Sequence, residues 1–274
     1  LQSRMITVSG GSLSFFNVGL ELQIRQSAPV DLWALFRLER PKSLRLQNVH
    51  VTVVNPTHAA ATVVECVAPT TSTFTKMGSM KDPQPIVPTR ILFDHALIRG
   101  ECNGLSLRDT APMRYEFRQV LFALGEWLLQ VERDPDSMKT PTDVFVELEH
   151  TTCLLGQGLL RSTHEDEFVE RPEPIEIVAR NNIFSCGPGS ALIEQPVAQK
   201  SMDFRQSLLR WSGERNQFDA LETFWLVRFR SPSDEALPLG FEEWRSWWGS
   251  GEINPSHNAR IDWSVDLLAR VILH

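Results

Sequence analysis

The chain has 274 residues, of which 42% are apolar and 22% are charged, and this balance excludes wholesale disorder. Its formal net charge is −7 with a pI near 5.6, so it lacks the clustered excess of Lys and Arg that nucleic-acid binding requires. No apolar run approaches the roughly 20 residues that cross a bilayer, so we expect no membrane insertion of this segment.

A five-residue motif with apolar first and third positions returns along the chain at intervals of about thirty residues. Another apolar side chain follows three residues beyond each copy. The seven copies are Leu13–Asn17, Leu44–Asn48, Ile91–His95, Tyr115–Gln119, Val146–His150, Ile177–Asn181 and, more weakly, Trp211–Arg215, and the following apolar residues are Leu20, Val51, Ile98, Phe122, Cys153, Phe184 and Phe218. Alternation with period two indicates strands, and regular repetition indicates a solenoid.

A second apolar segment follows each copy after a short turn, and no amphipathic helix lies between them. This pattern excludes a βαβ fold and predicts an all-β chain. We expect a right-handed, single-stranded parallel β-helix of about seven to eight coils over residues 5–230.

Within the motif, the first, third and eighth positions are predicted to fill the core. The fifth position has the same parity but is polar, which predicts an inward ladder that hydrogen-bonds turn backbone at a corner. Its members are Asn17, Asn48, His95, Gln119, His150, Asn181 and Arg215.

The long interval between the second and third copies contains a polar stretch without periodicity, residues 69–85. We expect it to be a mobile loop that projects from the body.

The tail, residues 231–274, is broken by Pro and Gly and holds one helix-compatible segment, Phe241–Trp248. Repeat proteins need an atypical terminal unit over the last open core, so this region is the predicted C-terminal cap. Its Trp244, Trp247 and Trp248 are read as cap packing, with recognition of a glycan or protein as the alternative.

The fourth motif position faces outward and carries Gln47, Asp94, Arg118, Glu149, Arg180 and Glu214 on successive coils. Charges of opposite sign in this order predict a ladder of surface ion pairs that holds the coils in register. The functional alternatives are Arg118 and Arg180 as binding residues and a polysaccharide-degrading site. Catalytic carboxylates for the latter would come from Asp94, Glu116, Glu147 and Glu149.

The four cysteines, Cys66, Cys102, Cys153 and Cys186, are dispersed and show no metal-ligand spacing, so we expect free structural thiols, which favours a reducing, cytoplasmic compartment. The run His164–Glu167 is expected to be a solvated loop. Phosphate-binding, zinc-protease and kinase motifs are missing from the sequence, and neither a cofactor nor a metal is expected.

Three segments, Val146–Leu160, Ala179–Phe184 and Trp211–Asp219, resemble β-helix regions of planctomycete bacteria, of the pectate lyase-like type. Such regions often lie downstream of serine/threonine protein kinase-like domains. The resemblance spans about Ile6 to Trp225. It implies the fold and a kinase-like parent protein, but no functional residue.

The sequence therefore favours a noncatalytic recognition or scaffold module that binds a protein or a glycan. The alternative is a polysaccharide lyase or glycoside hydrolase on the same scaffold, because function depends on the site rather than on the fold. Converging carboxylates in a groove would favour the enzyme, and a flat face of alternating charges would favour binding.

Overall fold

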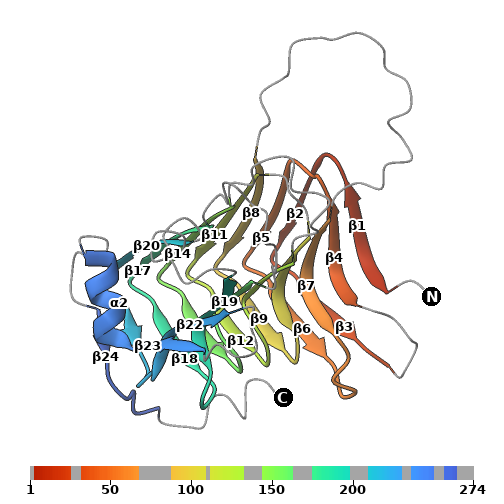
Figure 1. The fold of residues 1–274 in the computed structure, drawn as a ribbon. Helices are drawn as coiled ribbons and strands as arrows, with labels where there is room; N and C mark the ends of the chain where they lie inside the picture. The colour runs from red at the N-terminus through yellow and green to blue at the C-terminus, as the bar shows by residue number, and fades with distance from the viewer. Residues whose placement is uncertain are drawn as a thin grey trace, which may run out of the picture.

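The computed structural model describes residues 3–25, 32–67, 88–108, 112–132, 144–162, 175–197, 209–229, 236–249 and 256–263. These residues form a parallel β-helix of about eight coils, which runs in Figure 1 from β1 at the N-terminal end to the helix α2 at the other. The predicted fold is confirmed.

Three sheets run along the solenoid, and every third strand of the chain enters the same sheet, except Leu237–Leu239, which follows Thr223–Phe229 in one sheet and pairs with it antiparallel. We name them sheets A, B and C. Sheet A contains β1 (Arg4–Ser9), β4 (Trp33–Glu39), β7 (Ala61–Val67), β10 (Asn103–Leu107), β13 (Leu129–Val131), β16 (Leu160–Ser162), β19 (Ala191–Val197), β22 (Thr223–Phe229) and β23 (Leu237–Leu239).

The predicted motif strands form sheet B, and the apolar residues beyond them lie in sheet C. Sheet B contains β2 (Ser12–Phe16), β5 (Ser43–Gln47), β8 (Thr89–Asp94), β11 (Met113–Arg118), β14 (Val144–Glu149), β17 (Ile175–Arg180) and β20 (Leu209–Glu214). Sheet C contains β3 (Gly19–Gln23), β6 (His50–Val54), β9 (Leu97–Gly100), β12 (Leu121–Leu124), β15 (Thr152–Leu155), β18 (Ile183–Cys186), β21 (Gln217–Phe218) and β24 (His257–Asn258).

The core consists of stacked inward side chains, as the first, third and eighth motif positions predict. From the second coil onward these positions are buried, for example Leu44, Leu46 and Val51 in one coil and Tyr115, Phe117 and Phe122 in a later one. Phe117 packs against Phe93 of the preceding coil, with ring centroids 5.5 Å apart. Stacking between coils therefore buries what a single coil would leave exposed.

The fifth motif position lies at a corner, as predicted, but the prediction that its side chain points inward is wrong. These residues adopt left-handed φ values, for example 54° at Asn17 and 51° at His150, and most of them, including those two, are exposed. Strict alternation of side chains holds only in extended backbone, and a left-handed residue turns the chain at the corner between sheets B and C. The residue that follows it points inward instead.

That inward sixth position is apolar in the early coils and polar in the later ones, where it forms an asparagine ladder. The backbone N–H of Thr151 donates to Asn182 Oδ1 at 2.8 Å, and that of Asn182 donates to Asn216 Oδ1 at 3.1 Å. The ladder ends at Ser256, whose Oγ accepts from the Asn216 N–H at 3.0 Å. The amides also donate to the carbonyls of Leu148 and Ala179, so the buried turn groups are paired.

The helix α2 (Phe241–Trp248) has the bounds of the predicted helical segment and lies over the last coil (Figure 1). Trp244 is fully buried and meets Trp211 edge to face at 5.1 Å. Within the described part of the tail, α2 therefore covers core that the last coil would leave open. No helix of the described residues has the length and apolar content that a bilayer-spanning helix needs.

The predicted loop at residues 69–85 and the run His164–Glu167 lie outside the described residues. The four cysteines are free, as expected, and all but Cys186 are fully buried. Burial raises the pKa of the Cys186 thiol to about 12, so this group is an unreactive thiol at neutral pH.

Candidate functional site

The outer face of sheet B carries the predicted line of alternating charges. Strand pairing places Arg118 opposite Asp94 on one side and opposite Glu149 on the other. Glu149 in turn lies opposite Arg180. The predicted register is therefore correct.

The ion pairs, however, run along a different line. Among these described side chains, Arg118 contacts neither Asp94 nor Glu149 and instead donates to Glu116 on its own strand, with 3.0 Å between Nη2 and Oε2. Residues two apart on a strand share a face at about 7 Å, within reach of an arginine. The arginines therefore pair with carboxylates at the second motif position, Glu116 and Glu147, rather than at the fourth.

Glu116 lies at the centre of this cluster and is only 2% exposed. Arg90 of β8 forms a bidentate pair with it at 2.8 and 2.7 Å, and Arg114 donates at 2.8 Å. Burial by itself raises the pKa of the Glu116 carboxyl, but the hydrogen bonds and charges of Arg90 and Arg114 outweigh it and hold the pKa below its ordinary value. Glu116 is thus an ionised acceptor.

Glu147 lies directly opposite Glu116 on the adjacent strand β14. It contacts Arg114 and Arg180, each at 3.3 Å. Two like charges placed opposite each other destabilise a sheet, and the surrounding arginines offset this repulsion. We name Arg90, Arg114, Arg118, Arg180, Glu116 and Glu147 the arginine face.

The other two carboxylate candidates lie at the corner beside the left-handed residues. Asp94 contacts His95 Nδ1 at 2.7 Å, and Glu149 lies 3.9 Å from His150 Nδ1. The predicted catalytic carboxylates are therefore on one face, but each has a basic partner.

The tryptophans of α2 form an aromatic cluster on the end of the solenoid. Trp248 stacks on Trp225 with centroids 5.9 Å apart, and Trp247 meets the same ring edge to face at 6.0 Å. Trp247 and Trp248 are partly exposed, whereas Trp244 is buried. Trp244 is enclosed by other aromatic rings, which agrees with cap packing rather than with the alternative of ligand recognition at this residue.

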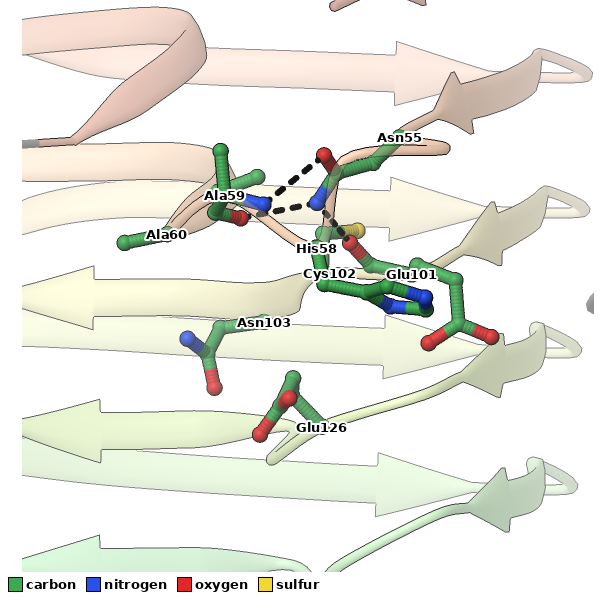
Figure 2. Close-up of a pocket in the computed structure, with 9 residues that line it drawn as sticks. Asn55, His58, Ala59, Ala60, Glu101, Cys102, Asn103 and Glu126 are labelled. Atoms are coloured by element: carbon green, nitrogen blue, oxygen red, sulfur yellow. Dashed lines mark hydrogen bonds between the residues drawn. The ribbon is translucent and has the colours of Figure 1, made fainter. Parts of the chain in front are cut away.

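A hollow of about 240 Å³ lies at the corner between sheets C and A. Figure 2 shows the residues around it, none of which the sequence predicted as site residues. It forms because the β6–β7 turn, residues 55–60, is longer than the β9–β10 turn, residues 101–102, and overhangs it. The lining residues are Asn55, His58, Ala59, Ala60, Ala61, Glu101, Cys102, Asn103 and Glu126.

Asn55 holds the longer turn in place. Its buried amide donates to the carbonyls of Ala59 at 2.7 Å and Glu101 at 2.9 Å, and its Oδ1 accepts from the Ala59 N–H at 3.1 Å (Figure 2). The first and third bonds close the turn, and the second fastens it to the next coil. The upper wall of the hollow is thus built by hydrogen bonds.

Beside the hollow, successive coils approach closely at two glycines. A Cβ at Gly156 would lie 2.1 Å from the Gly125 carbonyl oxygen, and one at Gly125 would lie 2.2 Å from Oε2 of Glu101. The Glu101 carboxylate therefore rests on bare backbone of the next coil.

The hollow contains two carboxylates, Glu101 and Glu126, on turns of successive coils (Figure 2). Partial burial raises the pKa of the Glu126 carboxyl, and the Glu101 charge raises it further, while Arg161 and His58 lower it. Among the described residues, neither glutamate forms an ion pair. A signal did exist in the sequence: Glu101 comes directly after β9 and Glu126 comes two residues after β12, the next strand of sheet C.

Within the described ranges, no group of three or more His, Cys, Asp or Glu side chains is arranged to hold a metal ion. Comparison with family models, with curated proteins and with solved structures found no match to the chain.

Proposed function

We propose that this β-helix is a noncatalytic recognition module that binds an acidic protein surface through its arginine face. The observation that supports this most is Glu116, a buried carboxylate held ionised beneath three arginines. A glycosidase or lyase would need a carboxyl or base free to exchange a proton. At this face the carboxylates instead position guanidinium groups.

The arginines retain the capacity to bind. Their side chains are 44–51% exposed, and each guanidinium has five N–H donors, more than its bonds to Glu116 or Glu147 use. Because Glu116 fixes three of them, less side-chain entropy is lost on binding. Arginine is also enriched at protein interfaces, where it pairs with carboxylates in a planar, bidentate geometry.

A protein is favoured over a glycan because of the aromatic side chains. Stacking on sugar rings needs exposed aromatic faces, but Trp244 is buried and Trp248 stacks on Trp225. Within the arginine face, Arg114 covers the Phe145 ring, with 4.5 Å between the Arg114 Cζ and the ring centroid, so this face of the ring is not open to a sugar.

The resemblance of Val146–Leu160, Ala179–Phe184 and Trp211–Asp219 to planctomycete β-helix regions supports one further element of the proposal. The module would belong to a larger bacterial protein with a kinase-like domain, and would serve that domain by binding rather than by phosphate transfer.

The test measures binding of the purified chain to a glutamate-rich peptide and to polygalacturonate, over a range of salt concentrations. The double variant Arg118→Gln/Arg180→Gln should weaken peptide binding about tenfold, since two charge-assisted contacts are lost. The matched control is Arg228→Gln, on the outer face of sheet A, where Arg228 pairs with Glu194 at 2.8 Å.

Tighter binding of polygalacturonate than of the peptide would move the proposal to an acidic glycan. New reducing or unsaturated ends that disappear in Glu149→Gln would overturn the noncatalytic assignment. Equal loss of binding in the control variant would show that the arginine face is not involved.

A further inference from the structure

The hollow differs from the arginine face because neither of its carboxylates forms an ion pair with a described lysine or arginine, and the one basic side chain in its lining is His58. Glu101 and Glu126 lie in the same hollow, and no Lys or Arg lines it. Burial is the larger cause of the raised pKa of Glu126, and repulsion from the Glu101 carboxylate in the same hollow adds to it. A bound cation would remove this repulsion.

The polar groups of the hollow would best be matched by a ligand with several hydrogen-bond donors. Two carboxylates offer acceptors only, and the amide oxygens of the lining are already used, since Asn55 Oδ1 accepts from Ala59 and Asn103 Oδ1 accepts from the Trp127 N–H at 3.1 Å. An ammonium group brings three donors and a guanidinium five, both with positive charge.

Apart from His58, the remaining lining is apolar or weakly polar. Ala59, Ala60 and Ala61 form one side, and the buried Cys102 lies beside them with a thiol that makes no hydrogen bond to the described residues. An alkyl stem would pack on these methyl groups while its charged head reached the carboxylates.

The size of the hollow agrees with a small group. A volume of about 240 Å³ corresponds to about eight waters at roughly 30 Å³ each, enough for the end of a lysine or arginine side chain but not for an oligosaccharide. A metal ion is a poorer fit, because the described residues offer no set of three ligands.

We propose that this hollow binds an alkylammonium or alkylguanidinium group, with the charged head between Glu101 and Glu126 and the stem along Ala59–Ala61. The group could be a free amine or a basic side chain of a partner protein. This site is independent of the arginine face, so either proposal can fail without the other.

The experiment titrates the full chain with butylammonium and butylguanidinium and follows backbone amide chemical shifts. Butanol and butyrate, of the same length, control for the stem and for charge. We expect the two cations to shift amides of residues 55–60, 101–103 and 126, and the alcohol and the anion to bind at least about tenfold more weakly.

Two variants separate charge from shape. Glu101→Gln/Glu126→Gln should lower cation affinity by about tenfold, whereas Glu21→Gln/Glu176→Gln, which removes the same charge elsewhere, should leave it unchanged. Gly125→Ala keeps both charges but displaces the Glu101 carboxylate, so it should lower affinity about threefold with the fold intact.

A peptide with one central lysine distinguishes the two sources of the cation. Tighter binding of this peptide than of butylammonium would indicate a partner side chain, and equal or weaker binding would indicate a free amine. Equal binding of butanol and butylammonium, no amide shifts at about 10 mM cation, or unchanged affinity in Glu101→Gln/Glu126→Gln would each overturn the proposal.

Discussion

The arginine face and the hollow each bring two glutamates together from neighbouring coils, but only at the arginine face do described arginines form ion pairs with them. Glu116 and Glu147 are neighbours on sheet B and are surrounded by four arginines of the same sheet. Glu101 and Glu126 are neighbours at the C-to-A corner and have no ion pair among the described residues.

The difference follows from the geometry of the two regions. A sheet repeats side-chain positions along and across its strands, so a charge has several fixed neighbours that can carry the opposite sign. A turn of two to four residues offers fewer such positions. Unmatched charge in a turn of a solenoid is therefore a better indication of a ligand site than matched charge on its sheets.

Removal of the central carboxylate of the arginine face should have the largest effect. Glu116→Gln leaves Arg90, Arg114 and Arg118 without their shared acceptor and should destabilise the fold by about 2–3 kcal/mol, less than for a fully buried pair because the arginines reach solvent. Urea unfolding measures this difference. Glu176→Gln on the same face is the control and should change stability by less than about 0.5 kcal/mol.

The pH dependence of that difference has a defined sign. The pKa of Glu116 is lowered in the folded state, so its stabilisation is complete above the ordinary value of 4.5 and is lost as the pH falls through the lower folded value. The stability gap between the wild type and Glu116→Gln should therefore stay constant from pH 7 to 5 and narrow below pH 4.5. A gap that narrows already near neutral pH would contradict the assignment.

Glu147→Gln should have a smaller effect. Its contacts to Arg114 and Arg180 are longer, at 3.3 Å, and more exposed to solvent, and the substitution also removes the repulsion with Glu116. We expect a loss of about 0.5–1 kcal/mol in urea unfolding. A loss as large as that of Glu116→Gln would mean that the two carboxylates act as one unit.

In the hollow, the pH dependence of the stability difference between variant and wild type should have the opposite sign. The pKa of Glu126 is raised, so its contribution to stability is present at low pH and is lost as the pH rises through the folded value. Glu126→Gln should therefore stabilise the fold at pH 7, by only about 0.3 kcal/mol because this partly exposed carboxyl is screened by solvent, and should not do so at pH 4. The groups that face it, Glu101, His58 and Arg161, are unchanged in this comparison.

Much of the fold could be predicted because the alternation and repetition of apolar residues are visible in short stretches of sequence. Tyr115, Phe117 and Phe122, which fill the first, third and eighth motif positions of one coil, are an example. The fifth position could not be assigned by parity, because a single left-handed residue such as His150 reverses the parity of everything after it. The motif predicted the strand register of Arg118 correctly but not its ion-pair partner. A long arginine side chain reaches several carboxylates, and only the three-dimensional structure shows which one it contacts. The hollow escaped prediction because it arises from a difference in length between two turns, 55–60 and 101–102.

The strand register of sheet B also gives its outer face a regular spacing that any protein docking on it must match. Side chains on this face recur about every 4.8 Å from coil to coil and about every 6.8 Å along each strand. A partner β-sheet with the same rise could match this grid over many coils. A partner helix laid across the coils, with a pitch of about 5.4 Å, would drift by half a repeat after about four turns. The solenoid therefore selects partners by their periodicity as well as by their charge.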